Sequence, residues 1–371
     1  MKKTVLLYFL LFYSASFFGQ QKILNNKELM TQIRLGVDKT YNSEFDAAEK
    51  IYREVEKKVP GHPAGPLLLG LNYYYKYYPL TPESPGAEPF VRNVQEAIKR
   101  AGIMIDKNSE DIEAQAMDMI ARALLNMFYV DNGNSFKAIP QIMPIYRSVM
   151  KGFTLKEKFN EYYFTTGLYN YYREAYPDAH PVYKPVTSFL QSGNKALGIK
   201  QLQYAADSCA FLRNEALIFL KIVYLNYENN PEASLIYAKR LFDKYPGNLT
   251  FLAGYAETLM MNKQFEKARA PIFLLLSRGS KDVSIVMKGL ILKGIYEEKV
   301  RKDFAIAEKN YIAGLKASEE LGPSVDAYRA YACLGLSRIY KLNGNADKAS
   351  DFRKKGENFA HYKYFFRLDQ P

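Results

Sequence analysis

Two short stretches of the chain gather tyrosines next to a basic residue. Residues 70–79 read GLNYYYKYYP and residues 167–177 read GLYNYYREAYP, and in both a Gly-Leu pair precedes two adjacent tyrosines and a basic residue at the same spacing. Tyrosine is large, rigid and amphipathic, so it suits a binding surface, and the basic residue could pair with a carboxylate. The candidate partner groove comprises Tyr74, Tyr75, Lys76, Tyr171, Tyr172 and Arg173.

The same tyrosines also have a simpler interpretation. On a helix Tyr74 and Tyr78 share one stripe, and Tyr73 and Tyr77 share another. A tyrosine stripe at helical spacing more often packs between helices than faces a ligand. We therefore favour packing, and a ligand-facing groove is the alternative.

Residues that commonly carry catalysis or bind metals are few and scattered. The three histidines, His62, His180 and His361, show no paired spacing, and the sequence has no nucleophile-elbow, P-loop or dinucleotide-binding motif. We expect these histidines to be ordinary solvated side chains. Cys209 and Cys333 lie in apolar helical stretches, so both thiols should be buried, unpaired and inert. The sequence thus predicts no catalytic, cofactor-binding or metal site, and no cofactor.

The charge distribution bears on the partners. The 371 residues carry a formal net charge of +12 at pH 7, and the lysines and arginines are spread along the chain. Nucleic-acid-binding arms have instead a dense block of basic residues. We predict no nucleic-acid partner. The favoured interpretation is a solvated basic surface, and a weak preference for acidic partners, or peripheral contact with an anionic membrane, is the alternative.

Residues 1–20 have the pattern of a secretory signal peptide. Lys2 and Lys3 precede an apolar run from Val5 to about Tyr13, and small residues follow at 14–16. This run is shorter than the roughly 20 apolar residues of a membrane span, so an uncleaved anchor is the minor alternative. The predicted location is the periplasm, with secretion or surface association as the alternative.

The rest of the chain has the periodicity of α-helices. Apolar residues recur three and four positions apart, as at Leu220, Val223, Tyr224 and Tyr227. Short breaks rich in Gly, Pro or Asn separate these segments and leave room only for tight turns. We predict roughly sixteen or seventeen helices packed as antiparallel pairs.

Small residues recur where paired helices would have to cross closely. Their spacing follows a unit of about 34 residues, the period of tetratricopeptide repeats. Residues 29–62 and roughly 212–361 resemble this family, which implies a right-handed α-solenoid of antiparallel helix pairs. The repeat-packing positions are Gly36, Ala48, Ala256, Ala268, Ala307, Gly314, Ser337, Tyr340, Ala349 and Gly356.

The predicted organisation is an all-α solenoid with an irregular central section. Residues 21–62 would form an N-terminal helix pair, 63–208 an irregular helical section with insertions, and 209–371 a C-terminal array. Residues 166–205 also resemble a segment of the eukaryotic inclusion-body-clearance tetratricopeptide proteins and of uncharacterised bacterial relatives, and no catalytic residue comes with that resemblance. The residues that carry it are Gly167, Leu168, Asn170, Pro185, Phe189, Gly193, Asn194, Gly198 and Leu202.

These observations predict a non-catalytic, exported helical-repeat scaffold that binds a protein or peptide in the cell envelope. The alternative is a receptor for a small molecule or glycan that uses a tyrosine-lined groove. An envelope enzyme with a site hidden in tertiary geometry ranks third. A scaffold predicts an open concave strip that carries both tyrosine pairs, whereas a small-molecule receptor predicts a closed pocket between helices.

Overall fold

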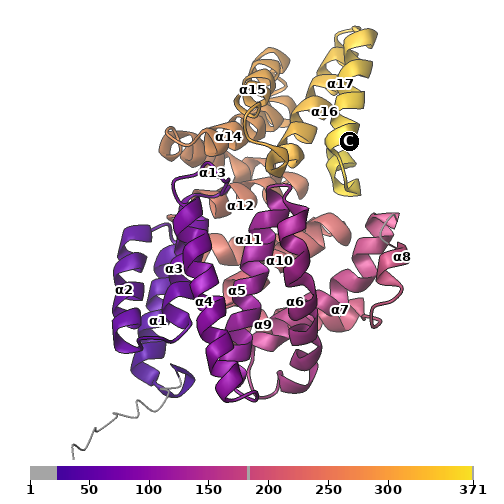
Figure 1. The fold of residues 1–371 in the computed structure, drawn as a ribbon. Helices are drawn as coiled ribbons and strands as arrows, with labels where there is room; N and C mark the ends of the chain where they lie inside the picture. Colours follow the sequence, from indigo (N-terminus) through magenta and orange to yellow (C-terminus); the bar gives the residue numbers. More distant parts are fainter. Residues whose placement is uncertain (1–22, 182–183, 370–371) are drawn as a thin grey trace, which may run out of the picture.

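A computed structural model describes residues 23–181 and 184–369, which form helices joined by turns (Figure 1). Seventeen α-helices and no strand occur in these residues, which confirms the predicted all-α class. The predicted signal peptide lies outside them. The helices are α1 (Lys27–Tyr41), α2 (Phe45–Lys58), α3 (Ala64–Lys76), α4 (Ala87–Lys107), α5 (Ile112–Asp131), α6 (Ser135–Leu155), α7 (Glu161–Ala179), α8 (Lys184–Thr187), α9 (Lys195–Ser208), α10 (Arg213–Ile222), α11 (Pro231–Lys244), α12 (Leu249–Met261), α13 (Phe265–Arg278), α14 (Val283–Tyr296), α15 (Phe304–Ala317), α16 (Asp326–Leu342) and α17 (Ala346–Phe359).

Each long helix packs mainly on its neighbours in sequence, as a solenoid of helix pairs requires. The first helices of the pairs are α1, α3, α5, α7, α10, α12, α14 and α16. Four helices of the central section, α4 to α7, are 19 to 21 residues long, whereas those of the C-terminal pairs mostly have 13 or 14. None of the helices in the described ranges combines the length and apolar character needed to span a bilayer.

The turns inside most pairs share one local conformation. A residue with positive φ stands between the two helices, and the amide after it often donates to a carbonyl five residues earlier, as Gln264 N does to Leu259 O at 2.9 Å. This left-handed turn satisfies the last carbonyls of the first helix and reverses the chain within a few residues. The positive-φ residues are Ser43, Gly133, Asn229, Lys263, Lys302 and Gly344.

The repeat-packing residues lie where paired helices touch. A Cβ atom on Gly36 would come within 2.5 Å of the Tyr52 ring, so α1 and α2 approach too closely there for a larger residue. In the last pair the Ser337 hydroxyl donates to the Ala349 carbonyl oxygen at 2.7 Å, and a Cβ on Gly356 would lie 2.9 Å from the Leu334 side chain. Ala48, Ala256, Ala268, Ala307 and Ala349 are all buried, Gly314 lies against Ile291, and Tyr340 stacks on Phe352.

The stack coils until its N-terminal end meets the turn between α11 and α12, about 205 residues later in the chain. The Asp38 carboxylate accepts from the Tyr245 hydroxyl at 2.6 Å and pairs with Lys244 at 2.9 Å. The Asn248 side-chain amide donates to the Tyr41 carbonyl oxygen at 2.8 Å. We call these contacts between residues 38–42 and 244–248 the closure seam. They turn an open coil into a closed ring of helices around a central space.

Candidate functional site

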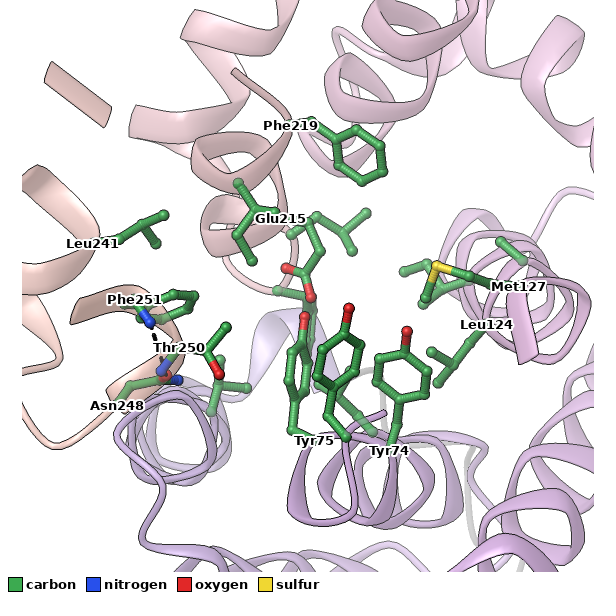
Figure 2. Close-up of a pocket in the computed structure, with 18 of the residues that line it drawn as sticks. Tyr74, Tyr75, Leu124, Met127, Glu215, Phe219, Leu241, Asn248, Thr250 and Phe251 are labelled. Carbon is green, nitrogen blue, oxygen red and sulfur yellow. Dashed lines mark hydrogen bonds between the residues drawn. The ribbon is translucent and has the colours of Figure 1, made fainter. Parts of the chain in front are cut away.

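A cavity of about 770 Å³ lies inside this ring. The first helices α3, α5, α7, α10 and α12 supply most of its wall, and α1, α11 and α14 contribute at the edge. Figure 2 shows side chains from helices far apart in the chain pointing into the same space. Since first helices line the concave side of a solenoid, the cavity is the concave surface enclosed by the closure seam.

The cavity wall is mainly aliphatic and aromatic. Leucine and methionine side chains of α5, among them Leu124 and Met127, face aromatic residues of α3 and α10. A wall of this composition excludes water and favours apolar surface. Further apolar lining residues include Leu67, Leu68, Leu71, Met117, Ile120, Phe164, Leu168, Ile218, Phe219, Ile222, Leu241 and Phe251.

Glu215 places a carboxyl group in this apolar space. It belongs to the first turn of α10, and its side chain lines the cavity. Figure 2 shows its carboxyl pointing into the same space as the hydroxyl ends of Tyr74 and Tyr75. Its Oε2 atom is buried and has no hydrogen-bond partner among the described residues. The residue as a whole is half-buried because its remaining surface faces the cavity.

Burial raises the pKa of Glu215 to about 8, well above the ordinary glutamate value. The cause is desolvation, because an ionised carboxylate loses its hydration among apolar walls. At pH 7 Glu215 is therefore mostly the neutral carboxylic acid. A bound group that favoured the carboxylate would release a proton from it.

The other charged groups around the cavity are held by the protein or lie at its edge. Lys221 pairs with Glu257 at 3.1 Å, and Lys76 pairs with Asp46 at 2.7 Å. Asp282 uses its carboxylate to cap the first turn of α14. Asp131 is the last residue of α5 and is exposed at the cavity edge. The protein atoms around its carboxyl still remove some hydration, which raises its pKa. Glu215 thus differs from these groups in being enclosed without a partner.

The first tyrosine motif lies on the cavity wall. Tyr74 is 6% exposed and packs edge-on against Tyr75 with ring centroids 5.4 Å apart, and its other face meets Phe90 at 6.0 Å. The Tyr75 hydroxyl receives a hydrogen bond from Tyr41 at 3.3 Å. Burial raises the pKa of both tyrosines far above the usual value, so both stay neutral. Tyr74 and Tyr75 therefore pack between helices and also form part of the cavity wall.

The tyrosines of the second motif lie elsewhere, outside the cavity wall. Tyr171 is fully buried, and its hydroxyl donates to Glu228 at 2.5 Å. Tyr172 packs edge-on against Tyr227 at 5.3 Å, and Arg173 donates to the Leu190 carbonyl oxygen at 3.3 Å. The structure therefore does not bring the two motifs into one strip. Whether either set binds a partner remains a prediction.

The glycine that opens each motif has the same role in both. A Cβ on Gly70 would lie 2.6 Å from Val94 of α4, and a Cβ on Gly167 would lie 3.1 Å from the Gly198 carbonyl oxygen of α9. Each glycine lies where its helix passes too close to its partner helix for a side chain to fit without a shift. The recurrence of Gly-Leu-x-x-Tyr-Tyr is thus explained by helix packing, with a cavity wall added in the first copy.

The expectation of a solvated His62 was wrong. His62 is only 5% exposed, its Nδ1 accepts from the Ala64 amide at 3.2 Å, and its Nε2 lies 3.7 Å from Glu113. Burial lowers the pKa of His62 to about 4, so the ring is neutral at pH 7. Cys209 and Cys333 are buried and unpaired, as expected. Within the described ranges no three His, Cys, Asp or Glu side chains come together as metal ligands would.

Sequence reasoning missed Glu215 and the cavity. The available signal was one acidic residue in the apolar segment RNEALIFLKI of α10. A helix position of this kind can equally face solvent. Only the ring closure, which joins segments far apart in the chain, determines that Glu215 faces an enclosed space.

No protein-family model and no curated protein matches this chain. Among solved structures, it is similar to human IFIT1 dimers. The complex with PPP-AAAA is 11% identical (86% of this chain, 69% of that chain, TM-score 0.43), and the complex with m7Gppp-AAAA is 12% identical (86% and 68%, TM-score 0.42). It is also similar to the C-terminal part of a TPR repeat-containing protein from Cytophaga hutchinsonii, 13% identical (88% and 95%, TM-score 0.32). Likeness at this level carries no functional argument, so the tetratricopeptide-like assignment rests on the chain's own helix pairs.

Proposed function

We propose that the chain is a non-catalytic helical-repeat scaffold that binds a small apolar molecule in its central cavity. The observation that carries this proposal is the enclosed apolar space of about 770 Å³ on the concave face. Small-molecule sites commonly occupy about 300–1,000 Å³ and have apolar walls with few polar groups. Among the alternatives raised by the sequence, a partly enclosed apolar pocket favours a small-molecule receptor over an open peptide-binding strip.

The polar groups at the cavity favour binding over catalysis. Sites of acid–base or nucleophilic catalysis commonly hold a second group that orients the first or activates it. In the described residues no side chain of another residue donates to Glu215, and the lysines on the wall are paired with their own carboxylates. Glu215 can therefore orient a ligand, and it has no positioned partner for proton transfer.

A homologous series of 1-alkanols tests the proposal by titration calorimetry. Each methylene buried against such a wall contributes about 0.8 kcal/mol, so affinity should rise about fourfold per added carbon from hexanol to decanol. Ala123 of α5 lines the cavity, and Ala123→Phe should occupy part of this space and weaken decanol binding. Ala270→Phe, at an exposed position of α13, is the matched control and should leave binding unchanged. Absence of saturable alkanol binding to the wild type would refute the proposal.

A protein or peptide partner in the cell envelope is a second candidate, and the outer face of α6 favours it. Phe136, Ile139 and Met143 are 88%, 58% and 54% exposed and lie on one side of this helix. A contiguous exposed apolar stripe of this kind is typical of an interaction site. In-cell crosslinking of a tagged protein should capture a defined partner that a Phe136→Ser, Ile139→Ser, Met143→Ser variant loses. Capture that is equal in both would contradict this role of α6.

Export to the periplasm is part of the same proposal and rests on residues 1–20. The expected result is recovery of the protein from the periplasmic fraction with an intact mass that lacks the first 16 to 20 or so residues. Recovery of the full-length chain from the cytoplasm would contradict export and would leave the cavity argument unaffected.

A further inference from the structure

Glu215 is unusual among the enclosed acidic side chains of this protein. The buried Glu161 carboxylate accepts three backbone amides, from Ala210, Phe211 and Leu212. Glu257 and Glu298 are buried with hydrogen-bonded cations. In the described part of the chain no group of another residue donates to Glu215. Because a buried acid without a partner costs stability, its position on the cavity wall points to a ligand that supplies the missing group.

The surroundings of Glu215 favour a cation over other polar groups. Tyr74 and Tyr75 of α3, and Tyr78 just beyond its end, line the same cavity, and the hydroxyl ends of Tyr74 and Tyr75 point into the same space as the Glu215 carboxyl. Hydroxyl and carboxylate oxygens can both accept hydrogen bonds from an ammonium group. The lysines on the wall cannot serve Glu215 because each pairs with its own carboxylate. The remaining acid at the cavity edge, Asp131, adds negative charge rather than positive.

We propose that Glu215 anchors the positively charged amino group of an amphipathic ligand whose apolar body fills the cavity. This inference rests on the proposed function, because it assigns the chemical class of the molecule bound at the same site. The amino group would donate hydrogen bonds to the Glu215 carboxylate, with the tyrosine hydroxyls as further acceptors.

Binding of such a ligand moves one proton. The ligand enters as the ammonium ion, and the neutral Glu215 carboxylic acid gives its proton to solvent as it forms the ion pair. No bond of the ligand is made or broken. The groups that face the cavity with Glu215 do not take part, since Lys76, Lys221 and Asp282 are already paired or capping. Near pH 7 close to one proton should therefore leave per ligand bound.

Calorimetry with three ten-carbon probes tests the inference. Decylamine should bind the wild type about tenfold more tightly than decan-1-ol, because the ion pair adds to equal apolar contacts, and decanoate should bind least. Titrations in two buffers of different ionisation enthalpy, both at pH 7, should give about one released proton for decylamine and none for decanol. Glu215→Gln should lose the amine preference and the proton release and keep decanol binding. Glu232→Gln, at an exposed position of α11, is the matched control.

The outcomes separate this inference from the proposed function. Decanol binding without any amine preference, or an amine preference that persists in Glu215→Gln, overturns the assignment of the ligand class and leaves the apolar cavity site standing. A wild type that binds none of the three probes overturns both. Circular dichroism of each variant checks that helicity is retained.

Discussion

Replacing Gly198 by alanine should destabilise the protein, whereas the same change at Gly102 should not. A Cβ on residue 198 of α9 would lie 2.7 Å from the Tyr171 amide nitrogen and 2.8 Å from the Gly167 carbonyl oxygen. Both are backbone atoms of α7 that cannot rotate away, so α9 would have to shift outward. At Gly102 of α4 a Cβ would meet no atom within 4 Å. Comparing the two variants therefore separates the effect of the close helix crossing from the effect of helix propensity.

Two opposing contributions set the size of the effect. Alanine is more favourable than glycine in a helix interior by about 1 kcal/mol. Overpacking a tight contact costs about 1–3 kcal/mol, and the upper part of that range applies where the obstructing atoms are backbone. Gly198→Ala should thus lose about 1–2 kcal/mol net, and Gly102→Ala should gain up to about 1 kcal/mol.

Urea unfolding followed by far-ultraviolet circular dichroism measures both variants against the wild type. Unfolding midpoints are the quantity to compare, because a long repeat array need not unfold in one step. The Gly198→Ala midpoint should lie below that of the wild type, and the Gly102→Ala midpoint at or above it. If Gly198→Ala proves as stable as Gly102→Ala, the close crossing of α7 and α9 is refuted, and with it the packing explanation of the second tyrosine motif.

Three further predictions concern Glu215, a buried ion pair and the closure seam. Burial raises the pKa of Glu215 to about 8, so between about pH 4.5 and 8 the folded protein keeps a proton on this carboxyl that the unfolded chain has lost. The urea midpoint of the wild type should therefore fall over that range relative to Glu215→Gln, and parallel pH profiles would contradict the burial argument. Glu298 accepts two hydrogen bonds from Arg338, at 2.6 and 2.9 Å, and although burial acts to raise the pKa of Glu298, this pairing lowers it overall. Glu298→Gln should cost about 3–5 kcal/mol at pH 7. Because the pKa of Glu298 is lowered in the folded protein, this cost should shrink only as pH falls below about 4.5, where the unfolded chain takes up a proton first. Thermal unfolding at pH 7 and pH 3 checks this, and an equal loss at both pH values would argue against the ion pair. Tyr245→Phe removes the hydroxyl that donates to Asp38, which should lower the free energy of unfolding by about 1 kcal/mol. The looser ring of helices should also bind decanol more weakly. Unchanged affinity in calorimetry would mean that the closure seam does not maintain the cavity.

Local patterns were enough to predict the helical class and the pairing. The crossing of α1 and α2 at Gly36 and Tyr52 lies within one repeat unit, so residue spacing alone indicates it. The closure seam could not be predicted in this way. Asp38 and Tyr245 are 207 residues apart, and neither lies in a pattern that distinguishes it from an ordinary surface residue. Whether two residues so far apart in the sequence meet depends on the summed twist of all the helix pairs that lie between them.

Contacts between different repeat units also explain why His62, which was expected to be exposed to solvent, is buried. His62 lies beside prolines, and such turns are usually at the surface. Its Nε2 lies 3.7 Å from Glu113, which belongs to α5, the third helix after this turn. The neighbour that buries the ring is therefore not part of its own repeat unit, and no local spacing marks it.

The two tyrosine motifs pack in the same way but face different surroundings, because they occupy different positions in the ring of helices. In both, the glycine permits a close helix crossing and the first tyrosine is buried against the following helices. In α3 the motif faces the enclosed space, so Tyr74 and Tyr75 become cavity wall opposite Glu215. In α7 only Leu168 of the motif reaches that wall, and Tyr171 instead donates to Glu228 on the far side of the helix. The first motif therefore contributes to a binding site because the ring of helices closes in front of it, and its sequence alone would not place it there. The variant Tyr245→Phe in the closure seam tests this dependence on ring closure more directly than a substitution of Tyr74 or Tyr75 would.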